Sequence, residues 1–143
     1  MSQILDISGE RPSLLRRVPV HLVVLAARLL ARQPPRRIVA VLRVLRNRAT
    51  PATHEETLRA RSHVTTTSTR CAGTYCLQRS LATVLLCRMR GVWPTWCSGV
   101  RTPPFAAHAW VEAERRRVGE PDEVHSYRVL LSVPPLGEPE RTP

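Results

Sequence analysis

Apolar and basic positions recur at helical spacing in the first half of the chain. Residues 14–32 are predominantly apolar and predict a first helix. The pair Pro34–Pro35 that follows would stop this helix. Residues 36–48 place apolar side chains on one face and arginines mostly elsewhere, so they predict a second, amphipathic helix. Thr53 precedes acidic residues in the manner of a helix N-cap, and a third helix is therefore expected over 54–63.

The strongest helical pattern lies in the middle of the chain. Residues 64–70 are small and polar, which predicts a loop before it. The stretch CLQRSLATVLLCRMRG then runs from Cys76 to Gly91, a residue type that often ends helices. We therefore predict a helix over 76–90. The apolar residues that recur at helical spacing within it are Leu77, Leu81, Val84, Leu85 and Met89.

Beyond Gly91 the pattern changes from a helical period to a strand period. Short segments alternate apolar and polar residues and are bounded by turn-forming residues. The predicted strands lie at 93–102, 107–113, 115–120 and 126–133. Helices first and strands second, with one helix leading into the sheet, predict an α+β fold.

The length of the chain fits one hydrophobic core, so we take residues 1–143 as a single domain. The domain divides into an N-terminal helical region, 13–63, and a catalytic core, 70–133, which carries the candidate catalytic residues. Residues 134–143 are rich in proline and are expected to form a flexible tail.

The composition is strongly basic, with 22 Lys and Arg against 11 Asp and Glu and a formal net charge of +11. All of the basic residues are arginines, and such a surface attracts acidic partners at long range. Only 4% of the residues are aromatic, and no row of them interleaves with the arginines. The stacking platform of a single-strand nucleic-acid binder is therefore missing, and we expect no nucleic-acid partner.

Residues 18–31 follow two arginines and superficially resemble a secretory signal. They include His21 and Arg28, lack a small-residue cleavage site and are too few to span a bilayer, so neither export nor membrane insertion is expected. A cytoplasmic location follows, where cysteines stay reduced. The four cysteines are irregularly spaced and include no C-x-x-C pair, so neither a metal nor another cofactor is expected.

Cys76 is the candidate nucleophile because it opens the helix predicted over 76–90. Unpaired backbone N–H groups and the positive end of the helix dipole favour a thiolate at that position, and the thiolate is the reactive form. Cys71 precedes the helix by about a turn and is the competing candidate. Cys87 lies inside the helix and Cys97 in a strand, so both are expected to be buried.

His108 is the candidate base, on a predicted strand beside aromatic residues. A hairpin joins this strand to the one that holds Glu120. A three-residue loop centred on Glu114 would place Glu120 directly opposite His108. A two-residue loop would instead place Glu120 opposite Ala109 and diagonal to His108. Glu120 is thus the carboxylate best placed to orient the imidazole.

Two other carboxylates compete with Glu120. Glu112 lies two pairs from His108 along the same strand, Asp122 lies in the following loop, and both are expected to be solvated surface charges. Asp122 is the stronger rival because hairpin registers can slip. Cys76, His108 and Glu120, in this chain order, supply a nucleophile, a base and an orienting carboxylate.

Several neighbouring residues are expected to support the site rather than react. Arg79 and Ser80 are predicted to form hydrogen bonds around the helix that begins at Cys76, whereas Gln78 is predicted to face solvent. The Cys76 backbone N–H is the expected donor to an oxyanion. The residues predicted to form the core or a cleft wall are Trp93, Trp96 and Trp110.

Three motifs between Arg70 and Pro121 resemble a known family. They read Cys-Leu-x-Arg-Ser-Leu-Ala, Pro-Phe-x-x-His-Ala-Trp-Val-Glu and Val-Gly-Glu-Pro. Together they resemble the stand-alone leader peptidase of lasso-peptide biosynthesis, a transglutaminase-like (papain-like) cysteine protease. Many of those relatives have aspartate where this chain has Glu120. The N-terminal helices match the family only in being apolar and rich in arginine.

The resemblance implies a cysteine endopeptidase that cuts a ribosomally made precursor between leader and core through a thioester. The family's cysteine, histidine and acidic residue map to Cys76, His108 and Glu120. The implied fold has N-terminal helices and an active-site helix followed by a small antiparallel sheet. The implied partners are the precursor leader peptide and a separate leader-recognition protein, with the lasso cyclase as a further candidate. The alternatives are a zinc-binding module and a basic peptide-binding adaptor without catalysis.

Overall fold

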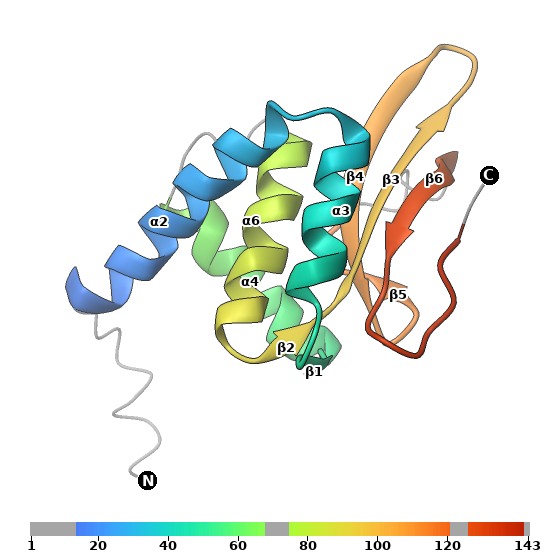
Figure 1. Ribbon diagram of the computed structural model, residues 1–143. Coiled ribbons are helices and arrows are strands. Elements are labelled where there is room, and N and C mark those ends of the chain that lie inside the picture. Colours follow the sequence, from blue (N-terminus) through green and yellow to red (C-terminus); the bar gives the residue numbers. More distant parts are fainter. Residues whose placement is uncertain (1–13, 68–74, 121–125, 142–143) are drawn as a thin grey trace, which may run out of the picture.

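The computed structural model describes residues 14–67, 75–120 and 126–141. Within these ranges, helices pack against one side of a small antiparallel sheet (Figure 1). The sheet has the strand order β5 (Arg116–Arg117), β4 (Ala106–Ala113), β3 (Thr95–Arg101) and β6 (Arg128–Val133). A separate parallel pair, β1 (Thr50–Pro51) and β2 (Val92–Trp93), lies below the helices in the view of Figure 1. The helices come first in the chain and the main sheet second, which agrees with the predicted α+β order.

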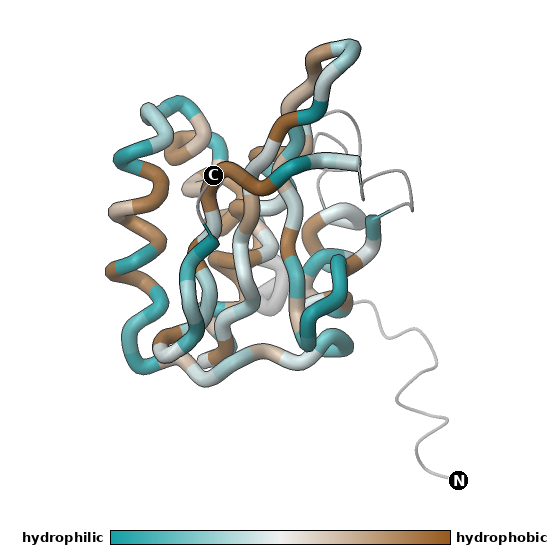
Figure 2. The backbone as a smooth tube through the Cα atoms, turned by 90° about the vertical axis from the view of Figure 1, so that its right-hand side faces the viewer, coloured by the Kyte–Doolittle hydropathy of each residue, from teal (hydrophilic) through white to brown (hydrophobic). Residues whose placement is uncertain are grey.

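The first two helices follow the predicted pattern. Helix α2 spans Leu14–Ala31 and helix α3 spans Pro35–Leu45. Pro34 is the N-cap of α3 and Pro35 begins the helix, where a missing N–H costs no intrahelical hydrogen bond. Hydrophobic and hydrophilic residues alternate along the helices (Figure 2), so that α3 turns one face to the core. The residues that α3 buries are Ile38, Val39 and Leu42.

Helix α4, His54–Thr67, starts with the capping arrangement that the sequence predicts. The Glu56 N–H donates to Thr53 Oγ1 (3.1 Å), and the Thr53 N–H donates to Glu56 Oε1 (2.9 Å). The helix continues past its predicted end at 63, so the predicted loop over 64–70 is wrong for residues 64–67. Val64 is fully buried, and that burial stabilises the extra turn. Residues 68–70 lie outside the described part of the chain.

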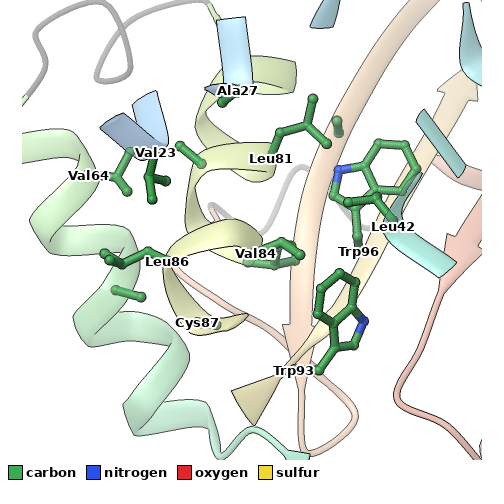
Figure 3. Packing of buried hydrophobic residues seen from close by; sticks show 14 of the residues in the cluster. Val23, Ala27, Leu42, Val64, Leu81, Val84, Leu86, Cys87, Trp93 and Trp96 are labelled. Atoms are coloured by element: carbon green, nitrogen blue, oxygen red, sulfur yellow. The ribbon is translucent and has the colours of Figure 1, made fainter. Parts of the chain in front are cut away.

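Helix α6, Cys76–Met89, is the central element of the core, close to the predicted bounds. It contacts α2 and α4 on one side and β4 on the other. Figure 3 shows its buried residues between the valines of α2 and α4 and the rings of Trp93 and Trp96. Gly91 follows with a φ of 84°, a conformation that favours glycine and ends the helix. The labelled α6 residues in that cluster are Leu81, Val84, Leu86 and Cys87.

The strands form an antiparallel sheet around β3. Strand β3 pairs with β4 on one side and with β6 on the other, and a bulge between Ser98 and Gly99 shifts the second register. A parallel pair of two-residue strands, β1 and β2, joins the segment before α4 to the segment after α6. The strand bounds are β1 Thr50–Pro51, β2 Val92–Trp93, β3 Thr95–Arg101, β4 Ala106–Ala113, β5 Arg116–Arg117 and β6 Arg128–Val133.

The hairpin between β4 and β5 has a two-residue loop, and Glu112 pairs with Arg117. The loop residues Glu114 and Arg115 have φ values of 55° and 65°, as a type I′ turn requires. The three-residue loop that would place Glu120 directly opposite His108 is therefore wrong, and the two-residue alternative is confirmed. The predicted strand over 115–120 shrinks to Arg116–Arg117.

Residues 134–141, expected to belong to a flexible tail, lie against the body of the domain. The Arg43 guanidinium donates to Glu140 Oε2 (2.6 Å), and the Arg46 guanidinium lies 3.3 Å from Glu140 Oε1. The Arg141 backbone N–H donates to Ser132 Oγ (2.6 Å). These contacts connect the tail to α3 and β6. In the described part of the chain, no helix is long and apolar enough to cross a membrane.

Candidate active site

Cys76 is the first residue of α6, as the sequence predicts. Tyr75 holds the N-cap position and makes no side-chain capping bond. Its side chain therefore does not satisfy the unpaired backbone N–H groups at the start of the helix. Burial alone would raise the pKa of the Cys76 thiol and is the largest single influence. The hydrogen bond with the His108 side chain, the Ala109 backbone N–H, and the positive charges of His108 and Arg79 act against it. Together they outweigh burial, and the pKa of Cys76 lies below its ordinary value of 9.0.

His108 comes from β4 and reaches the helix start from the sheet. Its Nε2 lies 3.0 Å from Glu120 Oε2, in a hydrogen bond, and its side chain also bonds with Cys76. Those two hydrogen bonds, Cys76 first, raise the pKa of His108 from 6.5 to about 9, although burial opposes them. A protonated imidazole carries one N–H on each ring nitrogen, so it can donate to both partners. The geometry therefore favours a thiolate–imidazolium pair.

Aromatic rings pack against His108 on its own sheet. The ring of Trp110 is stacked against the imidazole, with centroids 5.8 Å apart and an interplanar angle of 15°. The ring of Tyr127, just before β6, lies 5.3 Å from the same imidazole at 44°. Trp110 is fully buried, which limits the motion of the ring stacked on it. Tyr127 was not predicted to belong to the site, because its contact depends on the pairing of β6 with β3.

Glu120 is the carboxylate that the structure brings to His108. Its side chain is only 4% exposed. While Oε2 bonds with the imidazole, Oε1 lies 3.9 Å from an Arg61 guanidinium nitrogen and 4.0 Å from one of Arg79. Both guanidinium groups are themselves largely buried, so their attraction to the carboxylate is only weakly screened by solvent. Arg61 comes from α4, outside the motifs, and was missed by sequence reasoning.

The hairpin register explains how Glu120 reaches the imidazole without sitting opposite it. The Val118 N–H still donates to the Val111 carbonyl (3.0 Å), and the chain then leaves the ladder at Gly119. Gly119 has a φ of 68°, and a Cβ at that position would lie 2.8 Å from the Arg61 side chain. The turn and its close contact with Arg61 therefore direct the following carboxylate toward His108.

Among the competing candidates, Glu112 is described by the structure and does not share this geometry. Glu112 accepts a hydrogen bond from Trp110 Nε1 (3.0 Å) and another from the Arg141 guanidinium (2.5 Å). Its side chain is 13% exposed, so the expectation of a solvated surface charge is wrong. Cys71 and Asp122 lie outside the described residues, and their predicted roles stay predictions.

The other cysteines that the structure describes and the residues near Cys76 on α6 were predicted to be structural or solvent-facing. Cys87 and Cys97 are fully buried, as predicted, and burial raises the pKa of each thiol to about 12. Ser80 Oγ donates to the Leu77 carbonyl (2.9 Å) and accepts from Trp96 Nε1 (3.0 Å), as expected of a residue that supports the helix. Gln78 was expected to face solvent, which is wrong for its Oε1 atom, since that atom is buried and has no hydrogen-bond partner among the described residues.

All three predicted tryptophans are buried, which confirms their assignment to the core or cleft wall. A cavity of about 590 Å³ lies at the other end of β4, between Trp93, Glu112 and Pro134, and none of its lining residues belongs to the candidate site. Among the residues that the structure describes, no three His, Cys, Asp or Glu side chains gather closely enough to hold a metal ion.

A thiol at a helix start, an imidazole and a carboxylate, linked in that order, form the arrangement with which cysteine enzymes transfer acyl groups. A profile of the transglutaminase-like superfamily matches residues 20–132 of the chain. The match covers most of the chain, which therefore belongs to this superfamily. The superfamily includes cysteine proteases and acyltransferases. No curated protein and no solved structure matches the chain.

Proposed function

We propose that this protein is a cysteine endopeptidase that removes the leader from a ribosomally made lasso-peptide precursor. The observation that carries the proposal is that Cys76 opens α6 next to His108, whose Nε2 lies 3.0 Å from Glu120 Oε2. In this arrangement the pKa of the thiol is lowered and the pKa of the imidazole is raised. The superfamily supplies the cysteine-dependent chemistry. The three motifs around these residues resemble those of the lasso-peptide leader peptidase and supply the substrate class.

In the first step, the Cys76 thiolate attacks the carbonyl carbon of the scissile peptide bond. The tetrahedral oxyanion accepts a hydrogen bond from the backbone N–H of Cys76 at the start of α6. When the intermediate collapses, the C–N bond breaks and the His108 imidazolium gives its proton to the departing amine. That amine is the new N-terminus of the core peptide, and the leader remains attached to Cys76 as a thioester.

In the second step, water hydrolyses the thioester. Neutral His108 takes a proton from the attacking water, the C–S bond breaks, and the leader leaves with a new carboxylate. The Cys76 thiolate and the His108 imidazolium are restored together. Glu120 keeps the imidazole oriented and stabilises its positive charge in both steps, since its Oε2 lies 3.0 Å from Nε2.

Substrate delivery depends on a partner in this proposal. A separate leader-recognition protein binds the precursor leader, and the lasso cyclase consumes the released core. The net charge of +11 suits an acidic leader or an acidic partner surface, because opposite charges accelerate encounter. We expect weak cleavage without the recognition protein and faster cleavage with it.

The test is cleavage of a cognate precursor, with and without the recognition protein, followed by mass spectrometry. Wild type should give one leader and one core fragment. Cys76→Ala and His108→Ala should abolish cleavage, and Glu120→Gln should reduce it strongly. Cys71→Ala is the matched cysteine control and should cleave almost normally. Normal cleavage by Cys76→Ala would end the peptidase proposal, whereas cysteine-dependent cleavage of unrelated peptides alone would end the assignment to lasso precursors.

A further inference from the structure

Helix α2 is apolar on both of its faces. Its inner face packs into the core through the buried residues Val20, Val23, Val24 and Ala27. Its outer face carries three exposed leucines, Leu22, Leu25 and Leu29, with exposed fractions of 60%, 52% and 55%. A helix at a protein surface ordinarily has polar residues on its outer face. The outer face of α2 is therefore suited to burial against another molecule.

The three leucines follow the spacing of a helix–helix seam. They are separated by three and then four residues, which is the a, d, a spacing of a coiled coil. This seam, defined here as Leu22, Leu25 and Leu29, runs along the outer face of α2. Arg32, which is exposed, and the half-buried Arg28 lie next to it on the helix surface. The spacing suits a single partner helix laid along α2.

The positive charge of the N-terminal part of the chain further restricts the kind of partner that could bind the seam. Residues 11–54 contain ten arginines and no Asp or Glu. A second copy of this chain would bring the same arginines to the seam and would be repelled. An acidic partner would be attracted, and acidic residues beside its apolar stripe could pair with Arg28 and Arg32.

A membrane fits the same face less well than a protein helix does. Helices that lie on membranes commonly carry aromatic residues on the apolar side, and residues 14–48 contain no Phe, Trp or Tyr. The opposite face of α2 packs against the core, so only the outer face is available for insertion. In Figure 1, α2 lies at the outer edge of the helical layer, and α6 separates it from the sheet, so a bound helix would leave the sheet uncovered.

We propose that the seam on α2 is a docking site for an acidic amphipathic α-helix of a partner protein. The leucines contact the apolar stripe of that helix, and the neighbouring arginines contact its carboxylates. The inference does not rest on the proposed peptidase activity, because none of its residues belongs to the candidate active site.

The test uses two synthetic three-heptad peptides with leucine at a and d. One carries glutamate at e and g, which also prevents it from pairing with itself, and the other carries lysine there. Fluorescence anisotropy should show that the glutamate peptide binds the full chain and that added salt weakens this binding. Leu25→Gln should weaken it at least tenfold, and Arg28→Gln with Arg32→Gln should weaken it further. Met89→Gln, which changes an equally exposed apolar residue on α6, should leave it unchanged.

Several outcomes would overturn the proposal. Equal binding of the glutamate and lysine peptides would remove the role of charge, and unchanged binding by Leu25→Gln would remove the role of the seam. Sedimentation of the chain with vesicles of anionic phospholipid, lost in Leu25→Gln, would assign the face to a membrane. Self-association lost in Leu25→Gln would assign it to a second copy. Peptide binding only after deletion of residues 1–13 would assign the face to the chain's own N-terminal segment. Circular dichroism of each variant identifies any loss of folding.

Discussion

Replacement of Glu120 by glutamine tests whether this carboxylate tunes the candidate active site. The substitution keeps the size of the side chain and removes its charge. Oε2 would no longer stabilise an imidazolium 3.0 Å away, and the pKa of His108 should fall from about 9 toward 6.5. The Cys76 thiolate would then lose part of the positive charge beside it, so the pKa of Cys76 should rise toward its ordinary value of 9.0.

The size of the effect follows from the pKa of His108. The rise from 6.5 to about 9 corresponds to a preference of roughly 3 kcal/mol for the imidazolium, since one pKa unit is worth about 1.4 kcal/mol. Hydrogen bonds from Cys76 and then Glu120 produce most of that preference, and burial opposes it. If Glu120 supplies about half, its loss should lower the equilibrium constant that favours the thiolate–imidazolium pair over the neutral pair roughly tenfold.

The assay is the rate of alkylation of Cys76 by iodoacetamide as a function of pH, because the thiolate is the form that reacts. A Cys71→Ala background keeps the readout specific, since trypsin releases residues 71–79 as one peptide with both cysteines. Cys87 and Cys97 should stay unmodified in the folded protein, because they are buried and the pKa of each is about 12. In the background protein, the midpoint of the alkylation profile should lie below pH 9.0, the ordinary thiol pKa.

Glu120→Gln should move the midpoint of this profile to higher pH and slow alkylation about tenfold at neutral pH. His108→Ala should slow it more, because the imidazolium is then absent and burial alone would raise the thiol pKa. Glu138→Gln removes an exposed carboxylate elsewhere and should leave the profile unchanged. A Glu120→Gln profile that overlies the background profile would refute the coupling of Glu120 to the thiol through His108.

Three further predictions test other contacts. Arg61→Ala should slow alkylation of Cys76, whereas Arg61→Lys should keep part of the rate. Equal rates for the two variants and the wild type would exclude Arg61 as a positioning residue. Gly99→Ala should lower the melting temperature, because its Cβ would clash with the Arg128 carbonyl and overpacking costs about 1–3 kcal/mol; an unchanged melting curve would contradict this. Arg141→Ala, which removes a hydrogen bond to Glu112, should cost about 1 kcal/mol in urea unfolding. A loss too small to detect would show that this hydrogen bond adds no stability.

Local sequence signals identified the two elements that carry the candidate nucleophile and the candidate base. The period of α6 placed Cys76 at a helix start, and the alternation around His108 placed it on a strand. The contact between them depends on how α6 packs against β4, which neither pattern contains. The motif resemblance provided that connection, and the hydrogen bond between the two side chains agrees with it.

The hairpin shows why registers are difficult to read from sequence. A type I′ turn usually contains Asn or Gly, whereas here Glu114 and Arg115 adopt positive φ values without either residue type. No local signal therefore distinguished a two-residue loop from a three-residue one. The end of α4 was misread for a similar reason, because three threonines suggest a loop and only the burial of Val64 shows that the helix continues.

The charges around Glu120 suggest why arginines from two helices meet at this carboxylate. With the thiolate–imidazolium pair formed, Cys76 and Glu120 supply the negative charges, and His108, Arg61 and Arg79 supply the positive ones. Among the residues that the structure describes, the site then holds one more positive than negative charge. Arg79 lies three residues after Cys76 on α6 and lowers the pKa of the thiol, so the same helix carries the candidate nucleophile and a cation that stabilises its thiolate.

This surplus matters most when the thiolate attacks a carbonyl. The negative charge then moves from sulfur to oxygen without leaving the site, and the surrounding cations need not rearrange. A site with Glu120 and no arginines would place two anions beside a single imidazolium, and the carboxylate would compete with the thiolate for it. Arg61 and Arg79 near Oε1 offset that competition, while Oε2 remains free to orient His108. The arginines thus allow one buried carboxylate to support the imidazolium without destabilising the nucleophile.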